Sequence, residues 1–474
     1  MKESGRRILL ISPERHFSMS NEMYPSGALL LLGTILRNRG HIVKVVHMVA
    51  DKITMDGIPF VLKNFKPEIV GLTVSTFQTK QTKVLARYIK NHDEKVQIVI
   101  GGPHPSALKQ DILNDFPNVD IAVLGEGEKA FTEIVEEVPL PQINGICYRE
   151  GSKVINNPPS QLLQELDILP FPDLNFINLS KYSGPHPLGR RPGMFIMASR
   201  GCPFGCIFCS KSVYGSTVRY HSPDYIISLV EYLHRDFGVK EVFFQDDTFN
   251  LNRAWTENIL NKIIGSGLNK TMIFRTPFRV NEKLVDRELL NLMKKAGFWL
   301  IFYGVENGNQ DMLDRMKKGI TTEEVKRAFK LTHEAGIKTE ASFIIGLPGE
   351  TESTIKDSIN LWHEIKPYWT GFSRAIPFPN TPFERESRIK GNIICGDYDE
   401  YTVGKTMVRT ETMTAEQLEK WAQHCAKLVM LDTGRVLATH PAELYRVIKD
   451  VGTKGIADRL LRLGFQRPNK APLS

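Results

Sequence analysis

Two series of short apolar segments, each followed by an amphipathic stretch, constrain the fold of this 474-residue chain more than any other feature. Strand and helix patterns that alternate in this way predict parallel sheets covered by helices on both faces. In the first series the expected strands are Ile8–Ile11, Ile42–His47, Ile69–Thr73, Gln97–Ile100 and Ile121–Leu124. We therefore expect an α/β fold that begins with a doubly wound, Rossmann-like domain over residues 1–138.

The second series begins after a proline-rich stretch, residues 139–192, which predicts an ordered linker with a small hairpin near Ile143–Ile155. Its expected strands are Met194–Ser199, Glu241–Gln245, Met272–Arg275, Leu300–Val305, Thr339–Ile345 and Gly371–Ile376. Six βα units without a closing pair predict a partial (β/α)6 TIM-like barrel over residues 193–385, with its active face at the carboxyl ends of the strands. Residues 386–474 predict a helical C-terminal region, with helices at Thr414–Leu431, Pro441–Lys449 and Ile456–Leu463.

The composition excludes several other classes of protein. With 42% hydrophobic and 24% charged residues, the chain is neither disordered nor fibrous, and six cysteines are too few for a secreted disulfide scaffold. No apolar run approaches the ~20 residues that span a bilayer, and the first residues do not form a signal peptide. The net charge is +8, but no basic tail or basic-aromatic stripe predicts nucleic-acid binding. We expect a cytoplasmic protein.

Three cysteines form the strongest chemical signal. Cys202, Cys206 and Cys209 lie in a loop directly after the first expected barrel strand. Three thiolates on a short loop can bind three irons of a [4Fe–4S] cluster and leave the fourth iron open. Structural zinc normally has four closed ligands, and the nearest further candidate in sequence, His221, lies twelve residues on. The spacing therefore favours an iron–sulfur cluster over zinc.

This Cys-x3-Cys-x2-Cys loop, with Phe208 before its last cysteine, resembles the signature of radical S-adenosylmethionine enzymes. In that family the open iron binds S-adenosylmethionine, and one-electron reduction then yields a 5′-deoxyadenosyl radical. The resemblance extends to later strand ends and implies a set of residues around the cosubstrate: Phe208, Asp246, Asp247, Arg275, Glu306 and Gly346. For the two aspartates a helix N-cap is the alternative role. For Arg275, which we expect at the end of the third barrel strand, the alternative role is a structural ion pair.

A sixth strand-end segment, residues 377–382, matches a motif of the same family that usually has glycine where this chain has Asn380. Asparagine also tolerates a positive φ angle. We therefore expect the turn to survive this departure from the family pattern.

The first domain resembles the cobalamin-binding domain that is fused to one large branch of these enzymes. The residues expected to contact the corrin and its nucleotide tail follow the strands: Pro13, Thr73, Ser75, Thr76, Gly101, Gly102, His104, Gly125, Glu126 and Gly127. No Asp-x-His-x-x-Gly motif is present, so the resemblance implies a cobalt without a histidine lower ligand from this loop. For His104 we expect a contact near the cofactor, with a hydrogen-bonded loop histidine as the alternative. A Rossmann-like domain that has lost its cofactor is the alternative for the domain.

Together the resemblances imply a cobalamin-dependent radical enzyme, which we expect to methylate an unactivated carbon through methylcobalamin. Magnesium-protoporphyrin ester cyclases and lipid-modifying enzymes share this architecture, so a cyclisation or rearrangement is the alternative. A non-catalytic corrinoid carrier is a third reading, which the complete cysteine triplet argues against. The expected partners are a low-potential electron donor of the flavodoxin or ferredoxin type and a small-molecule, lipid or tetrapyrrole substrate, and peripheral membrane contact is left open. No pattern identifies the catalytic residues or the substrate.

Overall fold

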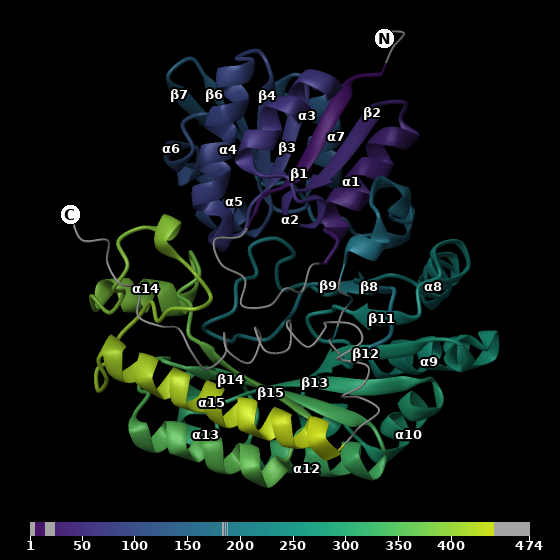
Figure 1. Cartoon of the computed structure of the whole chain (residues 1–474), viewed down its shortest axis with the longest axis vertical. Helices are drawn as coiled ribbons and strands as arrows, with labels where there is room; N and C mark the ends of the chain where they lie inside the picture. Colours follow the sequence, from purple (N-terminus) through teal and green to yellow (C-terminus); the bar gives the residue numbers. More distant parts are fainter. Residues whose placement is uncertain (1–4, 15–23, 183, 185, 187, 440–474) are drawn as a thin grey trace.

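The computed structural model describes residues 5–14, 24–182, 184, 186 and 188–439. Two sheets lie one above the other, with loops of both between them, as Figure 1 shows. The upper sheet belongs to the N-terminal domain and the lower one to the barrel. Among the described residues, no helix combines the length and the apolar character that crossing a bilayer requires.

The first domain is built on a seven-stranded sheet with the order β2-β1-β3-β4-β5-β6-β7. Its parallel strands are β1 (Arg7–Ser12), β2 (Ile42–His47), β3 (Ile69–Thr73), β4 (Gln97–Gly101) and β5 (Ile121–Val123). The strand order reverses between β1 and β3, and in open α/β sheets ligands bind beyond the carboxyl ends of the strands at such a point. The predicted doubly wound domain is confirmed.

Both faces of this sheet are covered because successive side chains of each strand point to opposite sides. In β1, Leu9 and Ile11 belong to one buried cluster, whereas Ile8 and Leu10 belong to the other. The helices that cover the sheet include α1 (Gly27–Asn38), α3 (Ile58–Phe65), α4 (Thr79–His92) and α7 (Gly127–Val135).

The first sheet extends beyond the predicted domain boundary. The hairpin β6 (Ile146–Glu150) and β7 (Lys153–Asn156) pairs antiparallel with β5, although we expected it within a linker over residues 139–192. Cys147 packs into one core of the sheet, and Tyr148 packs into the other. The hairpin therefore belongs structurally to the first domain.

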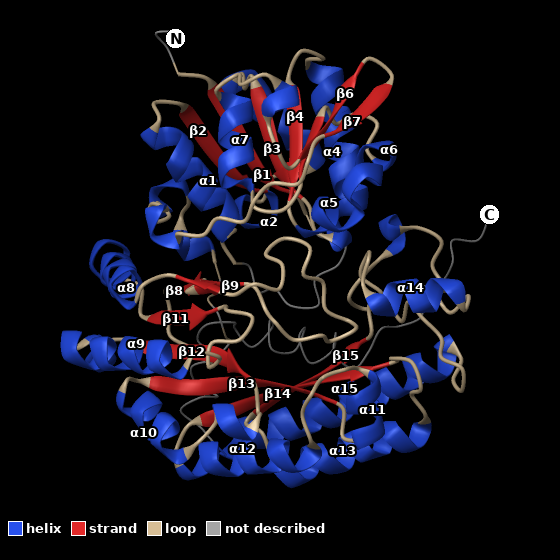
Figure 2. Cartoon of the chain, turned by 180° about the vertical axis from the view of Figure 1, so that it is seen from behind, coloured by secondary structure: helices blue, strands red, loops and turns tan. Residues whose placement is uncertain are grey.

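The barrel consists of six parallel strands in the order β15-β14-β13-β12-β11-β8, which confirms the predicted partial barrel (Figure 2). The strands are β8 (Gly193–Ile196), β11 (Glu241–Phe244), β12 (Ile273–Phe278), β13 (Phe298–Glu306), β14 (Lys338–Ile345) and β15 (Trp369–Arg374). The helices outside it include α8 (Pro223–Phe237), α9 (Arg253–Ser266), α10 (Arg287–Lys295), α12 (Thr322–Glu334) and α13 (Glu352–Ile365). Two short antiparallel strands, β9 (Ser199–Arg200) and β10 (Arg219–Tyr220), follow the first barrel strand.

Strand β12 is longer than predicted, because Pro277 does not end it. The neighbouring strand β11 pairs with β12 only as far as Arg275, so Pro277 pairs with β13 alone. A proline is tolerated where one side of a strand needs no N–H donor. Arg275 therefore lies inside the strand rather than at its end, and Arg279 is the first arginine beyond it.

The C-terminal region packs on the barrel. Helix α14 (Pro382–Ile389) follows the turn at Asn380, whose φ of 60° is the positive angle we expected. Helix α15 (Ala415–Thr439) replaces the shorter prediction Thr414–Leu431, and its Leu418 and Cys425 contact a cluster that includes Ile345. The further helices predicted near residues 441–449 and 456–463 lie outside the described residues.

Candidate functional site

The three cysteines lie on one loop, residues 201–218, whose two ends are joined by β9 and β10. At the base of the loop Gly201 has a φ of 94°, and a Cβ there would lie 2.3 Å from the carbonyl oxygen of Thr217. Only glycine allows this approach of the two strands. The backbone N–H of Cys202 also donates to the carbonyl of Gly215 at 3.4 Å. The loop is therefore closed at its base.

All three thiols are free, with Cys202 and Cys206 half-buried and Cys209 exposed. The middle of the loop is fixed at Ile207, whose N–H donates to Met316 and whose carbonyl accepts from Phe383. Among the described residues, no three His, Cys, Asp or Glu side chains converge as the ligands of one metal ion do. A [4Fe–4S] cluster does not require such convergence, because each thiolate binds its own iron. The donor set therefore fits the predicted cluster.

Arg279 lies against the cysteine loop. Its guanidinium carbon is 3.5 Å from the centre of the Phe204 ring, and its Nη1 is 4.0 Å from Sγ of Cys206. Its Nη2 also donates to the carbonyl of Lys318. Sequence reasoning missed this residue because it placed the end of β12 three residues too early.

Arg275, the predicted cosubstrate ligand, has a different environment. Its Nη1 lies 3.8 Å from Glu340 Oε2, and its guanidinium carbon lies 4.1 Å from the Phe243 ring centre. This geometry fits the alternative that we considered for it, a structural ion pair, and its contact with the cosubstrate stays a prediction.

Glu306 ends strand β13 and lies in a buried polar group near the loop. It has a φ of 69°, and Oε1 accepts a hydrogen bond of 2.6 Å from Nζ of Lys318. The hydroxyl of Ser342 donates to its other oxygen at 3.3 Å. Since the Lys318 carbonyl also accepts from Arg279, this carboxylate is connected to the cysteine loop through two side chains. The predicted placement of Glu306 beside the cosubstrate is compatible with this geometry.

The two neighbouring aspartates after β11 have different surroundings. Asp246 is buried and accepts from the N–H of Ala198 and the hydroxyl of Ser199, so it ties β11 to the strand that leads into the cysteine loop. Burial raises the pKa of Asp246 to about 7. Asp247 is exposed and lines a cavity, described below, that the first domain shares. Asp247 is therefore the aspartate that a bound ligand can reach.

Gly346, expected to support the adenine, lies in a turn held by a buried carboxyl group. Its N–H donates to Oε2 of Glu350 at 3.3 Å, and Asn307 donates to Oε1 at the same distance. Glu350 is fully buried, and burial raises its pKa to about 7. Phe208 packs nearby, against the cluster of apolar side chains that contains Leu347.

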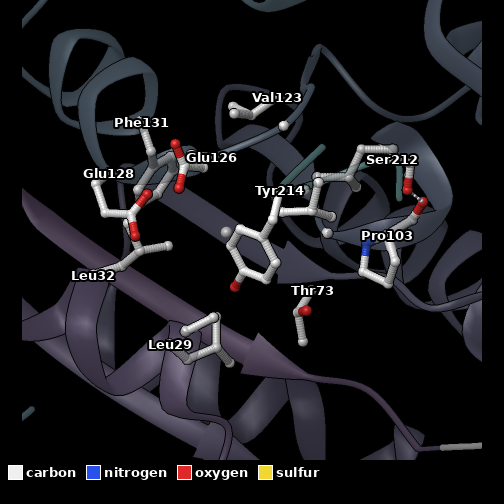
Figure 3. Close-up of a pocket in the computed structure, with 18 of the residues that line it drawn as sticks. Leu29, Leu32, Thr73, Pro103, Val123, Glu126, Glu128, Phe131, Ser212 and Tyr214 are labelled. Carbon is white, nitrogen blue, oxygen red and sulfur yellow. Dashed lines mark hydrogen bonds between the residues drawn. The ribbon is translucent and has the colours of Figure 1, made fainter. Parts of the chain in front are cut away.

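A cavity of about 360 Å³ lies between the first domain and the segment that directly follows Cys209. Figure 3 shows apolar side chains on its first-domain side, including Leu29, Leu32, Val123 and Phe131. The opposite wall is residues 210–215, and the Tyr214 ring projects into the space. The Ser212 hydroxyl joins the two walls by donating to the Pro103 carbonyl at 3.1 Å. The cavity is thus built by both domains.

The lining of the cavity suits the cobalamin that we expect in this domain, although a volume of about 360 Å³ holds only part of so large a molecule. Ligand pockets of this size are mostly apolar with a few polar groups. The last residue of β4, Gly101, leaves room, because a Cβ there would meet nothing closer than 3.8 Å, at Val123. Predicted contact residues that line the cavity are Thr73, Gly101, Gly102, Gly125, Glu126 and Gly127.

The other predicted contacts, Pro13, Ser75, Thr76 and His104, are not among the residues lining the cavity. Instead, the carbonyl of Pro13 accepts from Gln78, and Ser75 caps a turn with the same Gln78. The Nδ1 atom of His104 lies 3.2 Å from the hydroxyl of Thr76, and burial lowers the pKa of this imidazole to about 3. His104 thus resembles the buried, hydrogen-bonded histidine that we considered as its alternative.

Residues 196–361 match the radical SAM superfamily, and residues 18–135 match the B12 binding domain. An uncharacterized methyltransferase of Pyrococcus horikoshii is 31% identical over 423 residues, which cover 87% of this chain and 90% of the relative. The anaerobic magnesium-protoporphyrin IX monomethyl ester cyclase of Cereibacter sphaeroides is 27% identical over 426 residues, covering 87% of this chain and 68% of that protein.

A solved structure has the same fold. The cobalamin-dependent S-adenosylmethionine radical enzyme OxsB, with aqua-cobalamin and S-adenosylmethionine bound, superposes with a TM-score of 0.73. The alignment covers 96% of this chain and 72% of that one at 18% sequence identity.

Proposed function

Because this chain belongs to the radical SAM superfamily and carries a B12 binding domain, we propose that it transfers a methyl group to an unactivated carbon of a small-molecule substrate. The Pyrococcus relative is named a methyltransferase, which supports this reaction. When bound, the cluster with S-adenosylmethionine supplies one-electron chemistry that activates a C–H bond, and cobalamin supplies a methyl carrier. Radical SAM enzymes also need a reductant, which we expect to be a small low-potential electron carrier.

The shared wall at residues 210–215 is the observation that carries the proposal. This segment begins directly after Cys209 and lines the cavity of the first domain. A methyl group and an activated carbon must meet at close range, so their two cofactors need adjoining sites. The cavity and the cysteine loop adjoin through one continuous stretch of backbone.

The residues of the chain take separate roles in this proposal. Cys202, Cys206 and Cys209 hold the cluster, and Arg279 orders their loop by contacting Phe204 and Cys206. Glu306 and Asp247 are the carboxylates available to polar groups of S-adenosylmethionine. The apolar first-domain wall binds cobalamin by shape.

The test uses anaerobically purified protein with cluster and cobalamin restored. Reductant and S-adenosylmethionine are added, and S-adenosylhomocysteine and 5′-deoxyadenosine are quantified by mass spectrometry. We expect both products, with S-adenosylhomocysteine formed only when cobalamin is present. In the matched Cys206→Ala variant, 5′-deoxyadenosine formation should fall to background, because the open-iron cluster loses one ligand. Failure of wild-type protein to make S-adenosylhomocysteine would refute methyl transfer.

A cyclisation or rearrangement is the second candidate function. The similarity to the Cereibacter cyclase extends over 87% of this chain, so the shared architecture accommodates that chemistry as well. This candidate predicts 5′-deoxyadenosine without cobalamin-dependent S-adenosylhomocysteine in the same assay. One experiment therefore separates the two candidates.

A further inference from the structure

A buried network of charges connects the two domains beside the cavity. Arg200 and Arg219 extend from the base of the cysteine loop, and Glu126 and Glu128 extend from the segment that follows β5. Arg200 Nη1 donates to Glu126 at 2.7 Å, and its Nη2 donates to Glu128 at the same distance. Arg219 Nη1 donates to both carboxylate oxygens of Glu126 at 2.9 Å. Glu126 thus binds both arginines.

The two arginines are partners in the pairing of β9 with β10, so their side chains leave neighbouring positions of the loop base. Like charges placed opposite each other destabilise a strand pair. The side chains of Arg200 and Arg219 are only 6% and 4% exposed, so water cannot relieve the repulsion. A buried cation needs a paired anion, and Glu126 of the other domain serves both arginines, with Glu128 as a second partner of Arg200.

Glu126 is ionised in this environment. Burial alone would raise the pKa of its carboxyl group, but the hydrogen bonds from Arg219 and Arg200 hold that pKa below its ordinary value. The backbone N–H of Leu163 donates a further hydrogen bond of 2.8 Å to the same carboxylate. A carboxylate with this many donors is fixed in position as well as in charge.

The same arginines also hold the cavity wall. Arg219 Nη2 donates to the carbonyl of Tyr214 at 3.3 Å, and the guanidinium carbon of Arg200 lies 5.3 Å from the centre of the Tyr214 ring. Figure 3 places this ring inside the cavity, near Glu126 and Glu128. The network therefore connects the cavity to the base of the cysteine loop through direct contacts.

We propose that Glu126 is a positioning residue for the iron–sulfur loop. It neutralises Arg200 and Arg219 from the cobalamin domain, keeps the loop closed at its base, and thereby couples cobalamin binding to cluster binding. The coupling rests on the proposed placement of cobalamin in the cavity, whereas the closure of the loop does not.

Variants that change the number of buried charges test whether Glu126 keeps the cysteine loop closed at its base. Iron and sulfide per chain are measured after anaerobic reconstitution of Glu126→Gln, Arg219→Gln and the double variant, with Glu133→Gln on α7, the helix that follows Glu126, as a control. Glu126→Gln should lose cluster severalfold, because the buried Arg219 then faces a neutral amide while Arg200 beside it keeps only Glu128. Arg219→Gln should retain cluster, because Arg200 keeps both carboxylates. The double variant should recover cluster relative to Glu126→Gln, and a double variant as poor as or poorer than that single variant would overturn the proposal.

The coupling is tested by titrating cobalamin into cluster-loaded and cluster-free protein and following the absorbance. In wild-type protein the cluster should tighten cobalamin binding about tenfold, a usual size for coupling between two sites. In Arg219→Gln/Glu126→Gln the ratio should fall, since the Glu126 carboxylate is absent and only the Arg200–Glu128 pair still joins the loop base to the first domain. An equal ratio in both proteins overturns the coupling. If Gly101→Leu, which fills the cavity, leaves cobalamin affinity unchanged, then cobalamin does not bind in this cavity. In that case the iron measurements still test whether Glu126 keeps the cysteine loop closed at its base.

Discussion

The cavity of the first domain and the mouth of the barrel differ in the chemistry of the residues that line them. Apolar side chains such as Leu29 and Phe131, together with glycine backbone, form the first-domain wall of the cavity. At the barrel mouth, charged groups surround the cysteine loop, among them Arg279 and the buried pair of Glu306 with Lys318. If these are the two cofactor sites, as we propose, the difference predicts that the cavity selects its ligand mainly by shape and the barrel mouth mainly by charge.

Buried carboxyl groups repeat this contrast on a smaller scale. Glu126 and Glu350 are both buried after strand ends, but the pKa of Glu126 is lowered despite burial, whereas burial raises that of Glu350 to about 7. Arginines contact the first carboxyl group, and the hydrogen bonds to the second come from neutral donors. A neighbouring cation therefore decides which buried carboxyl group keeps its charge.

Filling the cavity should produce the largest effect. In Gly101→Leu the Cβ is accommodated 3.8 Å from Val123, and the rest of the side chain enters the cavity. We expect cobalamin affinity to fall about a hundredfold, as overpacking of a close-fitting site does. Equilibrium dialysis measures the affinity, and the iron content of protein reconstituted without cobalamin should stay at the wild-type level. The control is Gly265→Leu on α9, where an added Cβ meets no atom within 4 Å; a parallel loss of iron would break the separation of the two sites.

Neutralising a charge at the barrel mouth should give the reverse pattern. Glu306→Gln leaves Lys318 as a buried cation without its carboxylate, and such cations are unfavourable. We expect S-adenosylmethionine affinity to fall about tenfold, the change that roughly 1.4 kcal/mol produces. Cobalamin affinity should remain unchanged in the same preparation. Glu282→Gln, at an exposed pair with Arg327, is the control, and an equal loss of both ligands would contradict the comparison.

Two arginines, Arg275 inside β12 and Arg279 directly after it, test which residues contribute to cluster binding at the barrel mouth. Arg279→Gln removes the contacts with Phe204 and Cys206, so we expect iron retention to fall severalfold under mild chelation. Arg275→Gln removes a pair with Glu340 inside the barrel and should leave iron retention unchanged while lowering the melting temperature. Loss of iron in the Arg275 variant alone would reverse the assignment that the geometry favours.

The pH dependence of stability should give the smallest effect. Because the pKa of Glu350 is raised to about 7 in the folded chain, the folded state holds this proton more tightly than the unfolded state. Its stabilising contribution is complete below the unfolded pKa near 4.3 and is lost as pH rises through about 7. Glu350→Gln should therefore flatten the fall in melting temperature between pH 5 and 8. An unchanged slope would show that Glu350 keeps an ordinary pKa.

Local signals predicted most of the fold. Strands β2 and β3 begin and end at the predicted residues, and helices α10, α12 and α13 each have a side chain that caps their start: Asp286, Thr321 and Thr351. Long-range effects explain the differences. The hairpin joins β5 only through the folded sheet, and β12 continues past its predicted end at Arg275 because Pro277 pairs with β13.

The candidate site was predictable where motifs follow strands. The cysteines, Glu306 and the cavity glycines belong to such motifs, and the structure places them at the cysteine loop or the cavity. The partners that surround them were not predictable, because contacts between distant segments bring them there. Arg219 lies 93 residues from Glu126 in sequence, and no local pattern connects the two. Arg219 returns to the base of the cysteine loop because it pairs with Arg200 in the short strand pair β9–β10, which has only two residues on each side.

The divided construction of the cavity has a consequence for the order of biosynthesis. Synthesis proceeds from the N-terminus, and domains generally fold as units while it continues. The first sheet is complete at Asn156, but the wall that closes its cavity lies at residues 210–215. A growing chain therefore has a folded first domain with an open cavity until the ribosome has released the cysteine loop. If cobalamin binds in this cavity, as we propose, its lasting capture follows translation of residues 210–215, and the first domain alone should exchange it rapidly.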